Sequence, residues 1–155
     1  MTTSLRIGVI ADTHGLLRPE ALAALQGCER ILHLGDIGPA ALLDQLRALA
    51  PLEVVRGNND TDDWAAALAE TLQLELGGLR LYLIHDLKQL AVDPAAEGID
   101  VVLAGHSHKP LNEVRNGVLY LNPGSAGPRR FKLPIALAIL DIVDGQPRVE
   151  MVSLV

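Results

Sequence analysis

Three short aliphatic runs alternate with two helix-like segments in the first part of the chain. The runs cover residues 5–11, 30–34 and 52–55, and each stops at a polar residue or a glycine, as a strand buried in a parallel sheet does. Pro19 and Pro39 suit the first turns of helices over residues 19–25 and 39–50. The pattern predicts a β-α-β-α-β unit with right-handed crossovers.

Three hairpin signals interrupt the rest of the chain. Gly77-Gly78, Asn116-Gly117 and Asp144-Gly145 separate the runs 71–76 and 79–84, 111–115 and 118–121, and 135–143 and 148–155. We expect helices over 63–69 and 87–97 and a strand over 100–104. The mixture of βαβ units and hairpins predicts an α/β fold, a four-layer α-β-β-α sandwich of two mixed β-sheets flanked by helices. A chain of 155 residues suits a single domain over residues 1–155.

Composition and charge narrow the possible functions. Hydrophobic residues make up 49% of the chain and charged residues 21%, which is typical of a globular protein. The net charge of −6 argues against duplex nucleic acid as a partner, since proteins that bind it usually carry a basic stripe. Cys28 is the only cysteine, so a disulfide framework is excluded. The apolar runs are too short for a signal peptide or a membrane span, and we expect a cytoplasmic protein with no membrane partner.

Polar side chains of the kind that bind metals follow five predicted strands. In an open α/β sheet the crevice beyond the carboxyl ends of the strands is the usual ligand site, and residues at neighbouring strand ends can converge there. Each motif alone is typical of an ordinary surface residue, but their recurrence at successive strand ends predicts a metal centre. The predicted ligands are Asp12, His14, Asp36, Asn58, His85, His106 and His108.

Spacing and ligand type suggest how metal would be held. Asp12 and His14 lie two residues apart, as do His106 and His108, and in an extended segment such residues project from one face. Each pair is therefore expected to serve one cluster. Imidazole, carboxylate and amide ligands without sulfur suit Mn²⁺, Fe²⁺, Co²⁺, Ni²⁺ or Zn²⁺.

With these residues in this order, the chain resembles the calcineurin-like metallophosphoesterase superfamily, whose motifs run D-x-H, G-D, G-N-H-D/E, H and G-H-x-H. Its short length and the segment Asn122-Pro123-Gly124-Ser125 make it similar to the small bacterial and archaeal phosphodiesterases of the YfcE type. The resemblance implies two divalent metal ions per chain, with Mn²⁺ favoured and Asp36 as the bridging ligand. One ion would be held by Asp12, His14, Asp36 and His108, and the other by Asp36, Asn58, His85 and His106.

The resemblance also implies a reaction, in which a hydroxide that bridges the metals attacks phosphorus in line with the leaving group. The family's histidine after the ligand asparagine, a candidate proton donor to the leaving group, is replaced here by Asn59. We assign Asn59 and Asp60 to the catalytic part of the site, with Asp60 as a helix N-cap or a hydrogen-bond partner. Because asparagine cannot act as a general acid, and a missing acid costs roughly 10²- to 10⁴-fold, we expect small phosphodiesters with acidic leaving groups as substrates.

Other residues and functions leave alternatives open. Arg129, Arg130 and Lys132 form the one basic cluster, and Arg129 is a candidate substrate contact, although exposed basic residues in such loops commonly bind nothing specific. His33 is expected to be a hydrogen-bonded interior residue that faces away from Asp36. The second enzymatic alternative is a phosphomonoesterase, or a nuclease that acts on short products. The alternative from another class is a non-enzymatic scaffold, since the retromer subunit with this fold serves chiefly in assembly. A homo-oligomer is also open.

Overall fold

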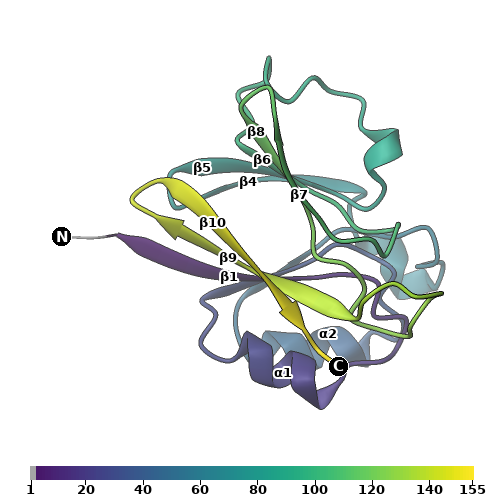
Figure 1. The fold of residues 1–155 in the computed structure, drawn as a ribbon. Coiled ribbons are helices and arrows are strands. Elements are labelled where there is room, and N and C mark those ends of the chain that lie inside the picture. The colour runs from purple at the N-terminus through teal and green to yellow at the C-terminus, as the bar shows by residue number, and fades with distance from the viewer. Residues whose placement is uncertain (1–2) are drawn as a thin grey trace.

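Two five-stranded β-sheets packed face to face form the body of the protein (Figure 1). The computed structural model describes residues 3–155. The first sheet has the order β10-β9-β1-β2-β3, in which β1, β2 and β3 are parallel, while β9 is antiparallel to β1 and to β10. Its elements are β1 (Ser4–Ile10), α1 (Pro19–Leu25), β2 (Arg30–His33), α2 (Ala41–Arg47), β3 (Leu52–Val54), β9 (Ala136–Val143) and β10 (Gln146–Ser153). The predicted β-α-β-α-β unit is present.

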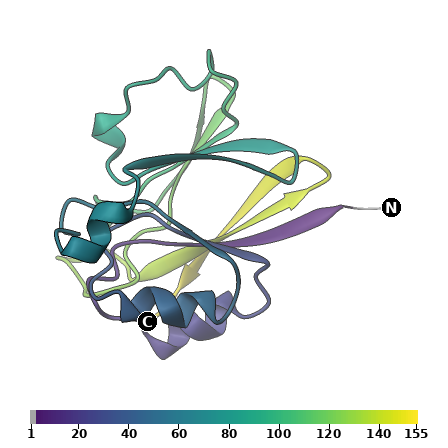
Figure 2. The ribbon, with the colours of Figure 1, turned by 180° about the vertical axis from the view of Figure 1, so that it is seen from behind.

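The second sheet, seen from behind above the first in Figure 2, has the order β4-β5-β6-β8-β7. Strands β5, β6 and β8 are parallel, and the two edge strands are antiparallel to their neighbours. Its strands are β4 (Thr71–Leu76), β5 (Leu79–Ile84), β6 (Val101–Leu103), β7 (Leu111–Arg115) and β8 (Val118–Asn122). All three predicted hairpins form, because each signal falls at a turn between antiparallel neighbours: Gly77-Gly78, Asn116-Gly117 and Asp144-Gly145.

An aliphatic core fills the space between the sheets. Ile7 and Val9 of β1 alternate with residues that face the other way, and both are fully buried in this core. Leu81, Leu83 and Leu103 meet them from the second sheet. Burial of each such side chain contributes about 1.5–3 kcal/mol, so the two sheets are held firmly against each other. The loops at the ends of the sheets are consequently fixed relative to one another.

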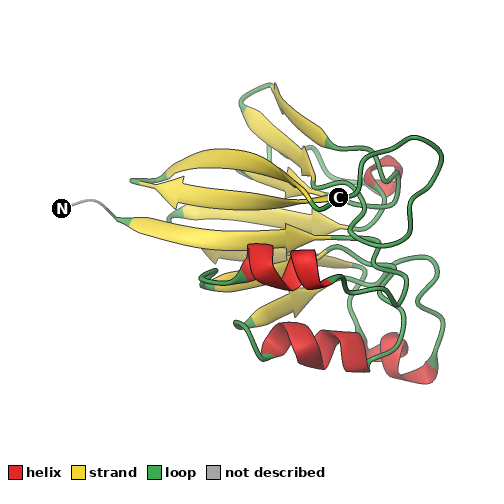
Figure 3. Ribbon diagram, turned by 60° about the horizontal axis from the view of Figure 1, so that its bottom comes forward, coloured by secondary structure: helices red, strands yellow, loops and turns green. Residues whose placement is uncertain are grey.

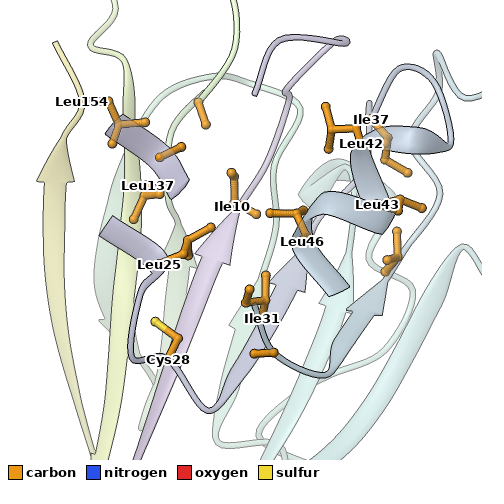
Figure 4. Packing of buried hydrophobic residues seen from close by; sticks show 14 of the residues in the cluster. Ile10, Leu25, Cys28, Ile31, Ile37, Leu42, Leu43, Leu46, Leu137 and Leu154 are labelled. Atoms are coloured by element: carbon orange, nitrogen blue, oxygen red, sulfur yellow. The ribbon is translucent and has the colours of Figure 1, made fainter. Parts of the chain in front are cut away.

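Helices α1 and α2 cover the outer face of the first sheet (Figure 4). Ile10 and Ile31 belong to the strand positions that point outward, and they pack there with Leu25 of α1 and Leu46 of α2. Leu154, which follows β10, joins the same cluster. The alternation of apolar residues along β1 and β2 therefore serves two cores, one on each face of the sheet.

An irregular segment covers the outer face of the second sheet in place of the helix expected there. The helix predicted over residues 87–97 is wrong, since only the 3-10 turn η2 (Leu87–Gln89) forms and bends and turns follow. The Asp86 side chain accepts a hydrogen bond from the Lys88 N–H at 3.0 Å and starts this turn. Pro94 lacks an N–H and cannot sit inside a longer helix. The segment still contributes apolar side chains to a small core on this face.

Two further predicted helices are shorter than expected. The helix predicted over 39–50 is α2, which ends at Arg47 and continues as hydrogen-bonded turns up to Pro51. The one predicted over 63–69 is a 3-10 helix, η1 (Asp63–Ala67). Within residues 3–155, no helix has both the length and the apolar character needed to cross a membrane.

The loops that follow the parallel strands gather at one end of the two sheets (Figure 3). Within the first sheet the Asp12 N–H donates to the Gly35 carbonyl at 3.0 Å, and within the second the Gly105 N–H donates to the His85 carbonyl at 2.9 Å. The two sheets are also joined here, because His85 Nδ1 lies 2.6 Å from the Leu34 carbonyl oxygen. This shared end carries the predicted ligands.

Candidate metal centre

Five of the seven predicted ligands adopt a left-handed backbone conformation, with φ of 56° at Asp12, 46° at His14, 57° at Asp36, 69° at His106 and 62° at His108. This conformation costs a residue with a side chain about 1–2 kcal/mol, and such strain concentrates at functional sites. The expectation of extended Asp-x-His and His-x-His segments is therefore wrong. The expected pairing is also wrong in part, because His106 and His108 belong to different clusters.

The first cluster consists of Asp12, His14 and His108, which each offer one ligand atom within 4.8 Å of the others. His108 Nε2 lies 3.4 Å from His14 Nε2 and 3.8 Å from Asp12 Oδ1. Asp12 is fully buried; its Oδ2 accepts from the His106 N–H, and its Oδ1 has no hydrogen-bond partner among the described residues. Burial is the main cause that raises the pKa of Asp12 to about 7 and lowers the pKa of His108 to about 4. His108 therefore presents a neutral imidazole.

The second cluster consists of Asp36, His85 and His106, with Asn58 beside them. Asn58 Oδ1 lies 3.0 Å from both His85 Nε2 and His106 Nδ1, and these two ring nitrogens are 3.3 Å apart. His85 Nδ1 donates to the Leu34 carbonyl, which leaves Nε2 to take either a proton or a cation beside Asn58. Burial lowers the pKa of His85, but its bonds to Asp36 and to the Leu34 carbonyl outweigh burial and raise it. Acceptor atoms this close together are favourable only with a proton or a cation among them.

Asp36 lies between the two clusters. Its Oδ2 is 3.3 Å from His85 Nε2 in the second cluster and 3.8 Å from His14 Nε2 in the first. Burial raises the pKa of the Asp36 carboxyl, but hydrogen bonds with His85 and with the Asn59 N–H outweigh burial and bring this pKa to about 2. The group is a carboxylate at neutral pH.

Asn59 and Asp60 both contact the Asp36 loop, in different ways. Asn59 is exposed, and it donates to Asp36 from its backbone N–H at 2.9 Å and from its side-chain amide at 3.2 Å. Asp60 is buried and accepts from the backbone N–H groups of Asp36, Ile37 and Gly57 at 2.9, 2.8 and 2.8 Å. A Cβ at position 57 would overlap the Asp36 carboxylate, so only glycine permits this approach. Of the two roles expected for Asp60, the structure has the hydrogen-bond partner, since η1 begins after Asp62.

His33 links the loops that follow β1 and β2, and it is an interior hydrogen-bonded residue as predicted. Nδ1 accepts from the Gly35 N–H at 3.1 Å, and Nε2 donates to Thr13 Oγ1 at 3.0 Å. The Thr13 hydroxyl in turn donates to the Ile37 carbonyl at 2.7 Å. This chain of bonds requires a neutral ring with its proton on Nε2. Burial is the main cause that lowers the pKa of His33 to about 3, and the nearby His85 lowers it further.

Sequence reasoning did not assign roles to three buried polar residues that position the ligand loops: Thr13, Asn122 and Ser125. Asn122 donates to the Gly105 carbonyl at 2.9 Å, and Ser125 Oγ donates to the Asp12 carbonyl at 3.0 Å. A signal was present for Asn122, because it ends the aliphatic strand β8, where a polar side chain needs a buried partner.

Two cavities flank the second cluster. One, of about 550 Å³, is lined in part by Asn58 and His85, and the other, of about 610 Å³, in part by His106 and Arg130. Asp86 lines both, and its Oδ2 lies 3.8 Å from His106 Nε2. Arg129 is exposed and is not among the residues that line either cavity, so Arg130 is the member of the basic cluster placed at the site. Substrate contact by Arg129 stays a prediction.

The donor set fits a pair of divalent cations. Asp12 Oδ1 is a buried oxygen that has no hydrogen-bond partner within residues 3–155, and the second cluster gathers lone pairs that a cation would satisfy. Imidazole, carboxylate and amide groups are the ligands that Mn²⁺, Fe²⁺, Co²⁺, Ni²⁺ and Zn²⁺ accept. The grouping of side chains is the one that the family resemblance implies.

Known proteins of one kind match nearly the whole chain. Residues 5–145 match the calcineurin-like phosphoesterase superfamily domain. A probable metallophosphoesterase of Methanothermobacter thermautotrophicus is 34% identical over 90% of this chain and 87% of its own length. Phosphodiesterase YfcE of Escherichia coli K12 is 27% identical over 84% of each chain. The structure of Vps29 complexed with Zn²⁺ from Entamoeba histolytica covers 97% of this chain and 100% of its own, with a TM-score of 0.73 and 25% identity. The predicted fold and family resemblance are confirmed.

Asp60→Asn is expected to lower the free energy of unfolding by about 2 kcal/mol, because its NH₂ group cannot accept from a buried backbone N–H and an unsatisfied donor costs about 1–3 kcal/mol. Urea denaturation measures the loss. Asp62→Asn is the matched control, since Asp62 is exposed and its side chain caps no N–H of η1; its effect should stay within about 0.5 kcal/mol. Equal stability of Asp60→Asn and the unchanged protein would contradict the role given to Asp60.

His33→Asn is expected to make stability less dependent on acid pH. The folded pKa of His33 is about 3, below its ordinary value of 6.5, so its contribution is fully present above pH 6.5 and is lost as the unfolded chain takes up a proton at lower pH. Asparagine keeps an acceptor for the Gly35 N–H but does not titrate. Between pH 7 and pH 5 the unchanged protein should lose about 2 kcal/mol more than the variant in urea unfolding. Parallel pH profiles would exclude this linkage.

Proposed function

This chain belongs to the calcineurin-like phosphoesterase superfamily, and we propose that it is a phosphodiesterase that works with two divalent metal ions. The observation that carries the proposal is the connection of two ligand clusters through one carboxylate, since Asp36 Oδ2 lies within 3.8 Å of a histidine nitrogen of each. The similar protein YfcE is named a phosphodiesterase, which supports hydrolysis of diesters rather than of monoesters.

The chain's own groups would hold the ions in two sets that share Asp36. The first set is Asp12, His14, Asp36 and His108, and the second is Asp36, Asn58, His85 and His106. When bound, the two cations would supply a water nucleophile that is deprotonated at neutral pH and positive charge against the phosphoryl oxygens. The ligand set suits several metals, and Mn²⁺ is the ion we favour.

Neighbouring hydrogen bonds direct the ligand atoms toward the space between the loops. The Leu34 carbonyl keeps the proton of His85 on Nδ1 and leaves Nε2 free to bind. The His106 N–H engages Oδ2 of Asp12 and leaves Oδ1 free. Burial raises the pKa of Asp36, but hydrogen bonds from His85 and from the Asn59 N–H outweigh burial and lower it, which keeps this carboxyl anionic. These bonds pre-organise the site before substrate arrives.

The residues around the clusters favour diesters over monoesters. The Asn59 amide is not acidic enough to protonate a leaving group, and it already donates a hydrogen bond to Asp36. The site therefore suits an acidic leaving group, which departs as an anion without taking up a proton. The two cavities that meet at Asp86 provide room for two ester arms, whereas a monoester has one. A small diester fits these cavities. A net charge of −6 disfavours duplex nucleic acid.

A scaffold is the second candidate function, because Vps29, a protein with this fold, is named for vacuolar protein sorting and not for hydrolysis. Vps29 was nevertheless solved with Zn²⁺ bound. Metal content alone therefore does not separate a scaffold from an enzyme. The complete donor set together with two adjoining cavities favours the enzyme. Turnover is the property that distinguishes the two.

Asp36→Asn is expected to release metal and to lower hydrolysis of bis(4-nitrophenyl) phosphate in Mn²⁺ by more than about 100-fold, since loss of even an indirect contact to a metal ligand costs 10- to 100-fold. Asparagine keeps the size of the side chain and tolerates the left-handed φ of 57°. Elemental analysis and turnover are measured on the same samples, and the unchanged protein should hydrolyse the diester faster than 4-nitrophenyl phosphate.

Asp44→Asn is the matched control, because Asp44 lies on the exposed side of α2 and pairs only with Arg47 at 3.4 Å. It should keep its metal and its rate. Full metal content and turnover in Asp36→Asn would exclude a bridging role. Metal without turnover of any diester in the unchanged protein would favour the scaffold.

Asn59→His is expected to raise the rate on diesters with alkyl leaving groups, by about tenfold or more, because a histidine at this position can protonate the departing oxygen. Rates with 4-nitrophenyl leaving groups should change little, since they need no acid. Asn59→Ala separates this gain from loss of the hydrogen bond to Asp36. An equal response of alkyl and aryl substrates to Asn59→His would contradict the missing-acid argument.

A further inference from the structure

Phe131 is strained and exposed, and it belongs to none of the buried apolar clusters of residues 3–155. Eight residues other than glycine have positive φ within residues 3–155: five are predicted metal ligands, Asn116 and Asp144 lie in hairpin turns, and the eighth is Phe131 with φ of 54°. A left-handed conformation is an outlier for so bulky a residue. Phe131 is also the only phenylalanine of the chain, and 87% of its surface is exposed. Strain of this kind at an exposed aromatic residue points to a ligand.

Phe131 lines the cavity of about 610 Å³ beside the second ligand cluster. The cavity lies over the outer face of the second sheet, between the start of η2 and the loop that carries Phe131. Its walls are largely apolar and include Leu87, Val102, Ala104, Leu111, Tyr120 and Leu133. His106 belongs both to this wall and to the second cluster, so a group in the cavity adjoins the site where phosphate would bind.

We propose that this cavity receives an aromatic arm of the substrate, of nucleoside size, and that Phe131 packs against its ring. The inference rests on the proposed function and names the substrate class for the same site. A volume of about 610 Å³ lies within the range of pockets that enclose whole small molecules and exceeds what a methyl or ethyl ester arm needs. Aromatic rings gain free energy by packing against each other beyond simple burial.

The two cavities differ in the charge of the residues that line them. The cavity beside Phe131, called the aromatic cavity below, is lined by three basic residues, Lys88, Lys109 and Arg130, and by one acidic residue, Asp86. The neighbouring cavity of about 550 Å³ carries four acidic residues: Asp60, Asp62, Glu70 and Asp86. Its one basic residue, Arg56, is already paired with Glu70 at 2.7 Å. A nucleoside joined to an anionic phosphoryl group therefore suits the basic cavity better than the acidic one.

The test measures binding of three phosphate monoesters to the Mn²⁺-loaded protein by calorimetry. Methyl phosphate supplies the anion alone, phenyl phosphate adds a ring, and adenosine monophosphate adds a nucleoside. The unchanged protein should bind the two aromatic compounds about tenfold more tightly than methyl phosphate, as expected for one ring-stacking contact. Phe131→Ala should remove most of this preference and leave methyl phosphate binding unchanged, whereas Phe131→Tyr should retain the preference.

Phe131→Gly separates binding from a structural role, because glycine adopts φ of 54° without strain. It should unfold at a temperature no lower than the unchanged protein and yet lose the aromatic preference. Val114→Ala is the control for a lost exposed apolar side chain, since Val114 is 67% exposed and does not line the cavity. It should bind all three compounds as the unchanged protein does.

The outcomes separate this inference from the proposed function. Equal affinity for all three compounds in the unchanged protein would overturn the aromatic cavity, even if diesters are hydrolysed. Loss of affinity for methyl phosphate in Phe131→Ala would overturn it as well. The aromatic preference without hydrolysis of any diester would sustain the cavity and refute the proposed function. Adenosine monophosphate should bind more tightly than phenyl phosphate, and the reverse order would overturn the nucleoside size proposed for the arm.

Discussion

The burial of two aliphatic sheet faces against each other is the constraint on which the ligand clusters depend. The loops after β1 and β2 bring Asp12 and Asp36, while those after β5 and β6 bring His85 and His106. Each cluster therefore draws side chains from both sheets, and neither sheet alone holds a complete set. The core between the sheets is close-packed and apolar, so it fixes these four strand ends without contributing a polar atom of its own.

Hydrogen bonds between the loops convert this approximate arrangement into fixed ligand positions. Asp60 joins the loops after β2 and β3, His33 and Thr13 join those after β1 and β2, and the bond from His85 to the Leu34 carbonyl joins the two sheets. The left-handed residues would be unfavourable in isolated loops. Among the ligands, the backbone N–H groups of Asp12, His14, Asp36 and His106 are hydrogen-bonded to neighbouring loops, and His108 is buried. Strain is retained in this way at a site that must present ligands to a metal.

The chain pattern predicted the features that depend on local chemistry. The hairpin glycines and the abrupt ends of the buried strands gave the sheets, and the polar residues at those ends gave the seven side chains that the structure brings together. The backbone conformation of the ligands was not predictable, because aspartate and histidine have no strong preference for positive φ and tertiary bonds impose it. The spacing argument placed His106 and His108 in one cluster, and only the family resemblance implied their separation. The helix expected over 87–97 does not form, because Pro94 lacks an N–H, and the irregular segment packs Leu87, Leu90 and Val92 against the small outer core instead. Arg130 could be distinguished from Arg129 only once the loop had a path in space.

Assembly of each cluster from distant parts of the chain bears on when metal can be captured. His14 and His108, which face each other at 3.4 Å, are 94 positions apart in the sequence. The second cluster likewise needs both Asp36 and His106. A growing chain therefore displays only incomplete ligand sets, such as Asp12 with His14, until His106 and His108 have emerged and the second sheet has formed. Metal acquisition thus falls after most of the synthesis and folding of the protein, at a stage when the choice of ion depends on the surrounding pool of free metal and no longer on the order in which the ligands were made.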